Sequence, residues 1–97
     1  MSINTKQIIA NASTPTFLIT VPPGVCSVLV GNGGNAGVIF GATQNPSELS
    51  GTNGYFIPPN SSVRFDCYVK SRGGDLYAIV ASGGTTQPVS ALVSTTD

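Results

Sequence analysis

The sequence contains no histidine and no tryptophan, and it has few charges of either sign. Charged residues are 8% of the chain, against about 25% in a typical globular domain. Without histidine, a serine or cysteine nucleophile has no imidazole base, and nothing in the sequence marks a Ser–Lys pair that would replace it. We therefore expect a protein that is not an enzyme.

The low charge also restricts the partners. The four basic residues cannot form the stripe that neutralises a nucleic-acid backbone, so we expect no binding to nucleic acid. No apolar run approaches the ~20 residues that span a membrane, and the opening stretch MSINTKQIIANAS lacks the apolar segment of a signal peptide. We expect folding in the cytosol and a weakly charged surface that packs against other copies or other proteins.

The sequence offers few residues that could bind a metal or a cofactor. The acidic residues are scattered along the chain, and the two thiols are isolated. A calcium site built from Asp66 or Asp75 with loop carbonyls is an alternative. Solvent-facing charge is the simpler interpretation, with Asp75 holding the glycine turn at 73–74. We therefore expect no metal and no cofactor.

The two cysteines, Cys26 and Cys67, lie far apart in the sequence. Without export to an oxidising compartment, we expect them to be reduced core thiols and not a disulfide. Cys67 shares the apolar alternation of Val63, Phe65 and Val69. This alternation predicts that the Cys67 thiol is buried, unpaired and chemically inert.

The chain contains 12 glycines and 7 prolines, residues that interrupt helices and strands. They recur roughly every 6–12 residues with β-branched and aromatic runs between them, which is typical of all-β proteins, and no breaker-free window keeps a helical apolar period. The sequence predicts one all-β domain over residues 1–97, a small β-sandwich or flattened barrel of about seven or eight short antiparallel strands. The expected strands are residues 6–10, 16–21, 25–30, 37–41, 55–57, 62–70, 76–81 and 89–93.

Two of these strands have informative patterns. Residues 62–70 alternate between apolar and polar side chains, which predicts one buried and one wet face, and residues 76–81 are apolar on both faces, as in a central strand. Residues 45–49 could form one helical turn with an Asn cap and a Pro at the first position, but an irregular loop is favoured. The ends, residues 1–7 and 94–97, are expected to be mobile or to reach a neighbour.

The stretch GNGGNAG at 31–37 fits a loose dinucleotide-binding fingerprint. That fingerprint requires a helix directly after it, whose N-terminus holds the pyrophosphate. Here the apolar run Val38-Ile39-Phe40 comes next, which predicts a strand. A glycine-rich hairpin connection is therefore the favoured interpretation.

Five residues are candidates for contacts with other chains. Tyr68 and Tyr77 alternate onto strand faces opposite the aliphatic side chains, where a tyrosine can anchor a protein contact or stack on a sugar. A tyrosine that covers a sheet edge with its hydroxyl in water explains the same pattern. The other candidates come from the segments next to the termini and are Lys6, Ile8 and Val93.

Three stretches, VLVGNGGNAGVIFGA, GTNGYFIPPNSSVRF and GDLYAIVASGG, resemble a pattern in small structural proteins of tailed-phage virions. In those proteins a strand ends in an Asn-Gly turn, the next strand ends in Gly, a Pro-containing turn precedes a wet-faced strand, and an L-Y-A-I strand ends in Ser-Gly. The match runs over about residues 28–93, and Pro-Pro-Asn at 58–60 stands where those proteins have a single Pro-Gly turn. The residues that carry the resemblance are Asn32, Gly33, Gly41, Gly54, Pro58, Leu76, Tyr77, Ala78, Ile79 and Gly83.

The resemblance implies a non-enzymatic virion component, above all a head decoration (cement) protein on the capsid exterior, assembled in the host cytoplasm. The implied partners are the major capsid protein or another virion protein, together with further copies of the chain, and a trimer is the expected homo-oligomer. A tail or head–tail connector subunit fits the same motif. Two other classes stay open, a glycan-binding β-sandwich module and an inhibitor or toxin-like sandwich. No catalytic residues carry over from the resemblance.

Overall fold

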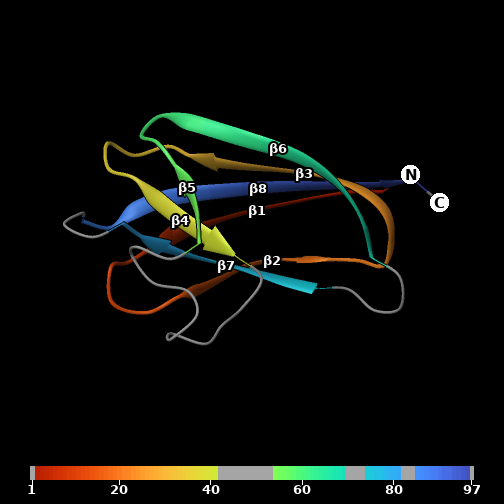
Figure 1. The fold of residues 1–97 in the computed structure, drawn as a ribbon, viewed down its shortest axis with the longest axis horizontal. Helices are drawn as coiled ribbons and strands as arrows, with labels where there is room; N and C mark the ends of the chain where they lie inside the picture. Colours follow the sequence, from red (N-terminus) through yellow and green to blue (C-terminus); the bar gives the residue numbers. More distant parts are fainter. Residues whose placement is uncertain (1, 42–53, 70–73, 82–84, 97) are drawn as a thin grey trace.

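The computed structural model describes residues 2–41, 54–69, 74–81 and 85–96. The regular secondary structure of these residues is entirely β (Figure 1), as the sequence predicts. This part of the chain therefore holds no helix long and apolar enough to cross a membrane. The strands are β1 (Ser2–Ala10), β2 (Thr16–Val21), β3 (Gly24–Asn32), β4 (Val38–Gly41), β5 (Tyr55–Ile57), β6 (Ser61–Val69), β7 (Gly74–Val80) and β8 (Gln87–Thr96).

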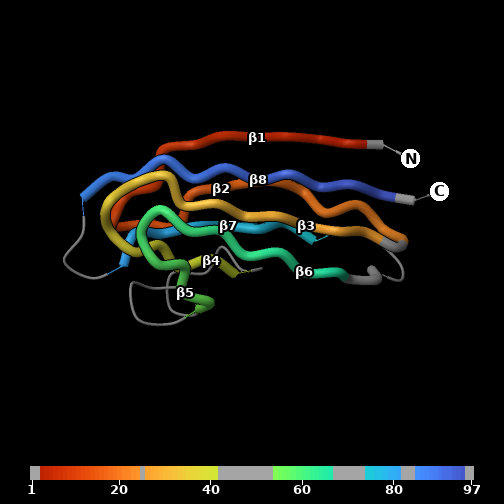
Figure 2. The backbone as a smooth tube through the Cα atoms, turned by 90° about the horizontal axis from the view of Figure 1, so that it is seen from above, coloured from red at the N-terminus to blue at the C-terminus, as the bar shows by residue number. Residues whose placement is uncertain are grey.

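The eight strands form two antiparallel four-stranded sheets. Sheet A has the order β1-β8-β3-β6, and sheet B has the order β2-β7-β4-β5. Every connection except that from β4 to β5 joins one sheet to the other. This order is that of an eight-stranded jelly roll, a sandwich made of two Greek keys. Figure 2 shows the first and last strands, β1 and β8, running side by side along the molecule.

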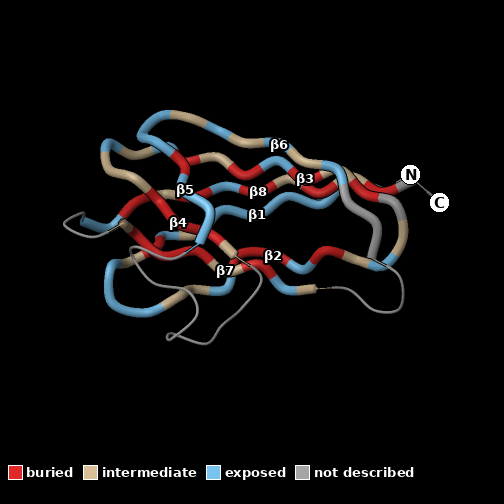
Figure 3. The backbone as a smooth tube through the Cα atoms, in the orientation of Figure 1, coloured by how far each residue is buried: buried red, intermediate tan, exposed pale blue. Residues whose placement is uncertain are grey.

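The core lies between the two sheets and consists mainly of aliphatic side chains. Figure 3 shows buried positions along strands of both sheets. Valine and isoleucine suit the inward positions because β-branched side chains pack well on a pleated surface. At the side where β5 and β6 approach each other, Phe40 stacks on Phe65 with 6.0 Å between the ring centroids. The largest fully buried aliphatic side chains are Leu18, Val28, Val30, Val38, Ile57, Val80, Val89 and Val93.

A β-bulge in β2 adds apolar surface to this core. The register passes from the pair Phe17–Tyr77 to the pair Ile19–Leu76. Leu18 is therefore an extra residue on β2. Leu18 and Ile19 are consecutive and both buried, whereas in a regular strand one of the two would face away from the core.

One end of the sandwich is closed by the buried side chain of Asn32. Its Nδ2 donates to the carbonyl oxygen of Ala36 at 2.7 Å and to those of Ile57 and Pro58 at 3.2 Å each. Its Oδ1 accepts from the backbone N–H of Gly34 at 3.0 Å. One amide side chain thus joins the turn after β3, in sheet A, to the end of β5, in sheet B.

A second buried amide, that of Gln87, packs against the same turn. Its Oε1 accepts from the N–H of Ala36 at 3.2 Å, and its Nε2 donates to the carbonyl oxygen of Thr85 at 3.3 Å. A Cβ atom on Gly34 would overlap the Gln87 amide, so a larger residue here would displace that amide from its hydrogen bonds. The stretch 31–37 leads into strand β4 and not into a helix, which confirms a connection between strands. The predicted hairpin is wrong, because β3 and β4 belong to different sheets.

The turn between β5 and β6 explains the Pro-Pro-Asn sequence at 58–60. Asn60 has a φ of 55°, in the left-handed region. Glycine favours this region, and asparagine tolerates it better than most residues. The N–H of Asn60 donates to the carbonyl oxygen of Gly34 at 3.1 Å, so this turn docks on the turn after β3.

Cys26 is disulfide-bonded, so the prediction that it is a reduced thiol is wrong. Its register partner on β6 is Cys67, the other cysteine of the sequence. The jelly-roll order makes β3 and β6 neighbours, although β4 and β5 separate them along the chain. Local sequence patterns do not predict a pairing between such distant segments. The predicted burial of the Cys67 side chain falls outside the described residues.

The strands at the two ends of the chain are longer than predicted. β1 begins at Ser2 and pairs with β8 along its whole length, and β8 extends to Thr96. Residues 2–7 and 94–96 are therefore paired within sheet A. The expectation that the ends reach a neighbour stays a prediction. Any contact they make with a neighbour is made as part of the sheet. The loop predicted at 45–49 falls outside the described residues.

Candidate interaction surface

The outer face of sheet A presents its side chains in level rows, because the four strands are in continuous register. Two adjacent rows give this face its shape. The first, the leucine row, consists of Thr5, Leu92, Leu29 and Arg64. The second, the glycine row, consists of Gln7, Ser90, Gly31 and Ser62.

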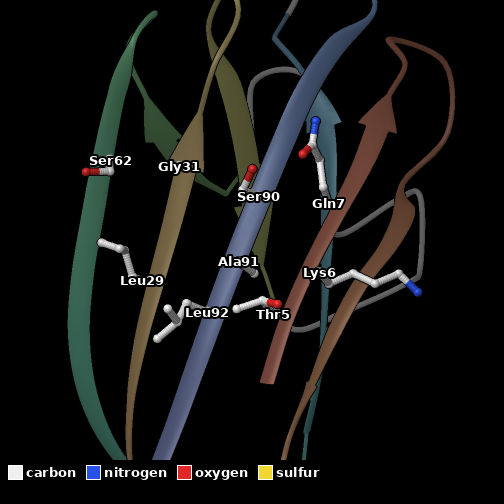
Figure 4. Close-up of a pocket in the computed structure, with 9 residues that line it drawn as sticks. All are labelled: Thr5, Lys6, Gln7, Leu29, Gly31, Ser62, Ser90, Ala91 and Leu92. Atoms are coloured by element: carbon white, nitrogen blue, oxygen red, sulfur yellow. The ribbon is translucent and has the colours of Figure 1, made fainter. Parts of the chain in front are cut away.

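The glycine row forms the floor of a shallow depression. The depression has a volume of about 430 Å³ and is lined by residues of both rows, together with Lys6 and Ala91, which lie between the rows (Figure 4). In Figure 4, Leu29 and Leu92 lie together on one side of it, and Gly31 and Ser90 lie on the other. A Cβ atom on Gly31 would meet only the Ser62 Cβ, at an ordinary 3.8 Å, so the space above this glycine is open.

Several aliphatic side chains on this face are left in contact with solvent. Ile3 is 63% exposed, Ile9 is 60% exposed and Leu29 is 38% exposed. Ile3 lies one row beyond the leucine row, and Ile9 lies one row beyond the glycine row. The three exposed side chains share one face, and apolar surface exposed on one face is compatible with binding of a protein.

The same face is free of ionisable side chains over the described residues of β1, β8 and β3. Its charges lie on the edge strand β6, at Arg64 and Asp66. Nε of Arg64 donates to Oγ of Ser27 at 3.0 Å, so this guanidinium is held against the sheet. A neutral face of this kind suits a protein partner, because depletion of charge is typical of the centre of a protein interface.

The outer face of sheet B has a different character. Ile39 and Ile79 also point outward but are each only 4% exposed, in a cluster with Tyr77 and Ala81. Phe17 packs edge-on against Tyr77 with 5.7 Å between the ring centroids. The aliphatic side chains of this face are therefore already covered within the chain, whereas the aromatic Phe17 and Phe56 of the same face remain 40% and 50% exposed.

The open edge of sheet A at β1 carries a lysine. Lys6 pairs with Ala91, which points into the core, so Lys6 lies on the inward side of β1. Its Nζ lies 6.0 Å from the ring centroid of Phe17. An inward-pointing charge on an edge strand is a device that hinders edge-to-edge pairing. This favours the face of sheet A over its β1 edge as the contact surface.

The five residues predicted at an interface have different positions. Lys6 is exposed, Ile8 is half-buried against the core, and Tyr77 is half-buried in the cluster on sheet B. Val93 requires a correction, because it faces inward and is buried in the core. The side chain of Tyr68 falls outside the described residues. The structure therefore does not bring these five residues together into one site.

The acidic residues considered for a calcium site are apart from each other. Asp75 lies in β7, where its Oδ1 accepts from Oγ1 of Thr20 at 2.8 Å. The turn that Asp75 is expected to hold includes residue 73, which falls outside the described residues. Asp66 lies on β6 of the other sheet. Over the part of the chain that the structure describes, no three His, Cys, Asp or Glu side chains gather into a metal-binding group.

Sequence reasoning missed the residues that shape the face of sheet A. Leu29 sits in the apolar run VCSVLVG, which is typical of a strand buried on both sides, and the polar start of β1 conceals a strand. Ile3 and Ile9 are an even number of residues apart, which places both side chains on one face of a strand. This spacing is the sequence pattern that could have indicated an exposed apolar face. The residues that carry the resemblance and that the structure describes mostly serve the fold, for example Asn32 and Leu76, which are buried.

No family model matches the chain, and no curated protein and no solved structure shows significant similarity to it.

Proposed function

We propose that the protein is a non-enzymatic structural protein of a tailed-phage virion, most specifically a decoration (cement) protein on the outside of the head. The observation that carries the proposal is the outer face of sheet A. It is neutral over three strands, exposes Ile3, Ile9 and Leu29, and rests on a four-stranded sheet. A decoration protein acts by binding other proteins, and such a face provides a binding surface without any chemistry.

The fold supports the proposal by analogy. Jelly rolls form the capsid domains of many viruses, and they also occur in lectins and cupins. Fold alone does not define function. The contact face and the resemblance of the strand and turn sequences to phage structural proteins therefore carry more weight than the fold.

The proposed location is the virion, with assembly in the host cytoplasm. Disulfides are rare in the cytosol but persist on the surfaces of released virions. The disulfide at Cys26 is compatible with this location if the bond forms after release. The proposed partners are the major capsid protein or another virion protein, together with further copies of the chain, and nucleic acid is not among them.

Two other functions use different surfaces or locations. A tail or head–tail connector subunit would need the same neutral face and differs only in its position on the particle. A glycan-binding module is favoured by aromatic residues in a concave site, but the three depressions described on this molecule are lined by no Phe, Tyr or Trp. We therefore keep the decoration protein as the proposal.

Quantitative mass spectrometry of purified virions that encode this chain tests the proposal. We expect the protein in a fixed stoichiometric ratio to the major capsid protein, and immunogold labelling is expected on the head. Labelling confined to the tail or connector would support the second virion role. Absence of the protein from purified virions would contradict both.

A matched pair of variants tests the face on particles that lack the protein. Leu29→Arg places a charge on the outer face of sheet A, and Thr20→Arg places the same charge on the exposed outer face of sheet B. We expect Leu29→Arg to abolish saturation of the particles and Thr20→Arg to retain it. Equal binding by both variants would remove the face of sheet A from the proposal.

A further inference from the structure

We propose that the outer face of sheet A packs against the same face of a second copy of the chain, in a two-fold symmetric dimer. The inference rests on the proposed role of this face as a contact surface. It identifies a second copy of the chain as the partner that binds the face. The alternative occupant is the capsid, and binding of variants to particles distinguishes it from a second copy.

The face is complementary to itself. The leucine row and the glycine row are neighbours, two residues apart on the same strands. A two-fold axis that crosses the strands at the level of Val30 lies midway between the rows. Rotation about this axis places each strand over its own copy with its direction reversed. Leu29 then lies over Gly31 of the second copy, and the leucine row fills the depression.

The rows farther from the axis match as well. The same rotation places Ile3 of one copy over Ile9 of the other, so the two most exposed large aliphatic side chains on this face cover each other. Arg64 lies over Ser62, which carries no charge. No two like charges among the described side chains of this face are brought together, and like-charge contacts are what would most strongly oppose self-association.

The area of the face reaches the lower limit for a specific interface. The four strands have nine or ten residues each. At about 4.8 Å between strands and about 3.3 Å per residue, they make a face of about 19 by 30 Å. Two such faces bury about 1,100 Å², just above the ~1,000 Å² that a specific interface needs. Stacked sheets pack at about 30° to each other because each is twisted, so the contact is densest near the axis, at Leu29 and Gly31.

The other surfaces fit a second copy less well. The β1 edge carries Lys6, and the outer face of sheet B buries its aliphatic side chains and keeps only the aromatic Phe17 and Phe56, among its described large apolar side chains, 40% and 50% exposed. A two-fold interface uses the same patch on both subunits and closes on itself. The structure thus favours a dimer as the basic unit over the expected trimer.

Sedimentation equilibrium of the isolated protein tests the proposal. We expect a monomer–dimer equilibrium that Leu29→Arg weakens at least about 100-fold, because two charges would enter the interface. Gly31→Val fills the depression but fits the monomer, since its Cβ meets only ordinary contacts. We expect it to weaken the dimer at least about tenfold. Thr20→Arg, on sheet B, is the matched control and leaves the dimer unchanged, and circular dichroism checks that each variant is folded.

A cross-linking experiment tests the register. Protein with Ile3→Cys is mixed with protein with Ile9→Cys and oxidised under conditions that keep the native disulfide. We expect a covalent dimer in the mixture and little in either protein alone. The reason is that equal positions lie about 20 Å apart across the axis.

The outcomes separate this inference from the proposed function. A monomer at every concentration, a trimer, or a dimer that resists Leu29→Arg and Gly31→Val would overturn the second copy as occupant. If the protein is monomeric and Leu29→Arg nevertheless abolishes binding to particles, the face belongs to the capsid contact. Absence from virions with an intact dimer would contradict the virion role and leave the dimer standing.

Discussion

The outer faces of sheets A and B both carry aliphatic side chains, but the chain covers only those of sheet B. Ile39 and Ile79 point away from the core and are still buried. Ile3 and Ile9, on the outer face of sheet A, remain more than half exposed. Buried aliphatic groups stabilise the monomer, whereas exposed ones gain free energy only when a partner removes them from water.

This difference assigns separate roles to the two layers. Substitutions of the buried aliphatic side chains on the outer face of sheet B should reduce the free energy of unfolding of the single chain. Substitutions on the outer face of sheet A should leave that free energy almost unchanged and affect association. Variants of the two sheets can break or sharpen this separation, and the largest effect is expected from the cross-link in sheet A.

The largest expected difference between the sheets comes from the disulfide bond in sheet A. Sheet A contains the disulfide at Cys26, between neighbouring strands. Cys26→Ala should lower the free energy of unfolding by about 2–5 kcal/mol, because the cross-link no longer constrains the unfolded chain. Urea denaturation of the variant and the oxidised protein measures the difference. Two alkylatable thiols in the denatured native protein, or an unchanged midpoint, would contradict the expectation.

Truncation of one aliphatic side chain on each sheet compares the outer faces directly. Ile79→Ala should destabilise the chain by about 2–4 kcal/mol, because it removes buried methyl groups and leaves a cavity. Leu29→Ala, on sheet A, should change the unfolding free energy of the monomer by about 0.5 kcal/mol at most, as for exposed residues. Thermal or urea denaturation at a concentration where the protein is monomeric measures both. Equal losses would remove the distinction between the faces.

Two glycines close together in the chain sharpen the comparison. Gly34→Ala should cost about 1–3 kcal/mol, because the new methyl group overlaps the buried Gln87 amide and forces the turn to shift. Gly31→Ala should be neutral or slightly stabilising, because the space on the face of sheet A is open. Denaturation of the two single variants in parallel gives the difference. A loss at Gly31 as large as that at Gly34 would show that the depression is filled within the monomer.

The smallest effect is expected at the edge of sheet A. Lys6→Gln removes an exposed contact between an ammonium group and the Phe17 ring, at 6.0 Å from the centroid. Such a contact contributes about 0.5–1 kcal/mol. The second expected result concerns aggregation. Without its inward-pointing charge the β1 edge is less protected, so light scattering at high concentration should rise. A variant as soluble as the native protein would show that Lys6 does not guard this edge.

Local sequence patterns were sufficient to predict the fold class but did not predict the exposed apolar face of sheet A. Glycine and proline spacing predicts the strands because breakers act within a few residues, and the alternation around Arg64 predicts the faces of β6 correctly for the same reason. The pairing of β3 with β6 joins distant segments, so the disulfide at Cys26 was missed. The outer face of sheet A was missed because Leu29 and Gly31 form rows only with their neighbours on β8 and β6, which are distant in the sequence.

Hydroxyl-radical footprinting across a concentration series tests the central claim, that the outer face of sheet A is the one prepared for a partner. Leu29 on sheet A and Phe17 on sheet B are a matched pair, with 38% and 40% of their surfaces exposed. We expect oxidation of Leu29 to fall as the protein is concentrated and oxidation of Phe17 to stay constant. Constant oxidation of Leu29 at every concentration, or protection of Phe17 in its place, would contradict the account.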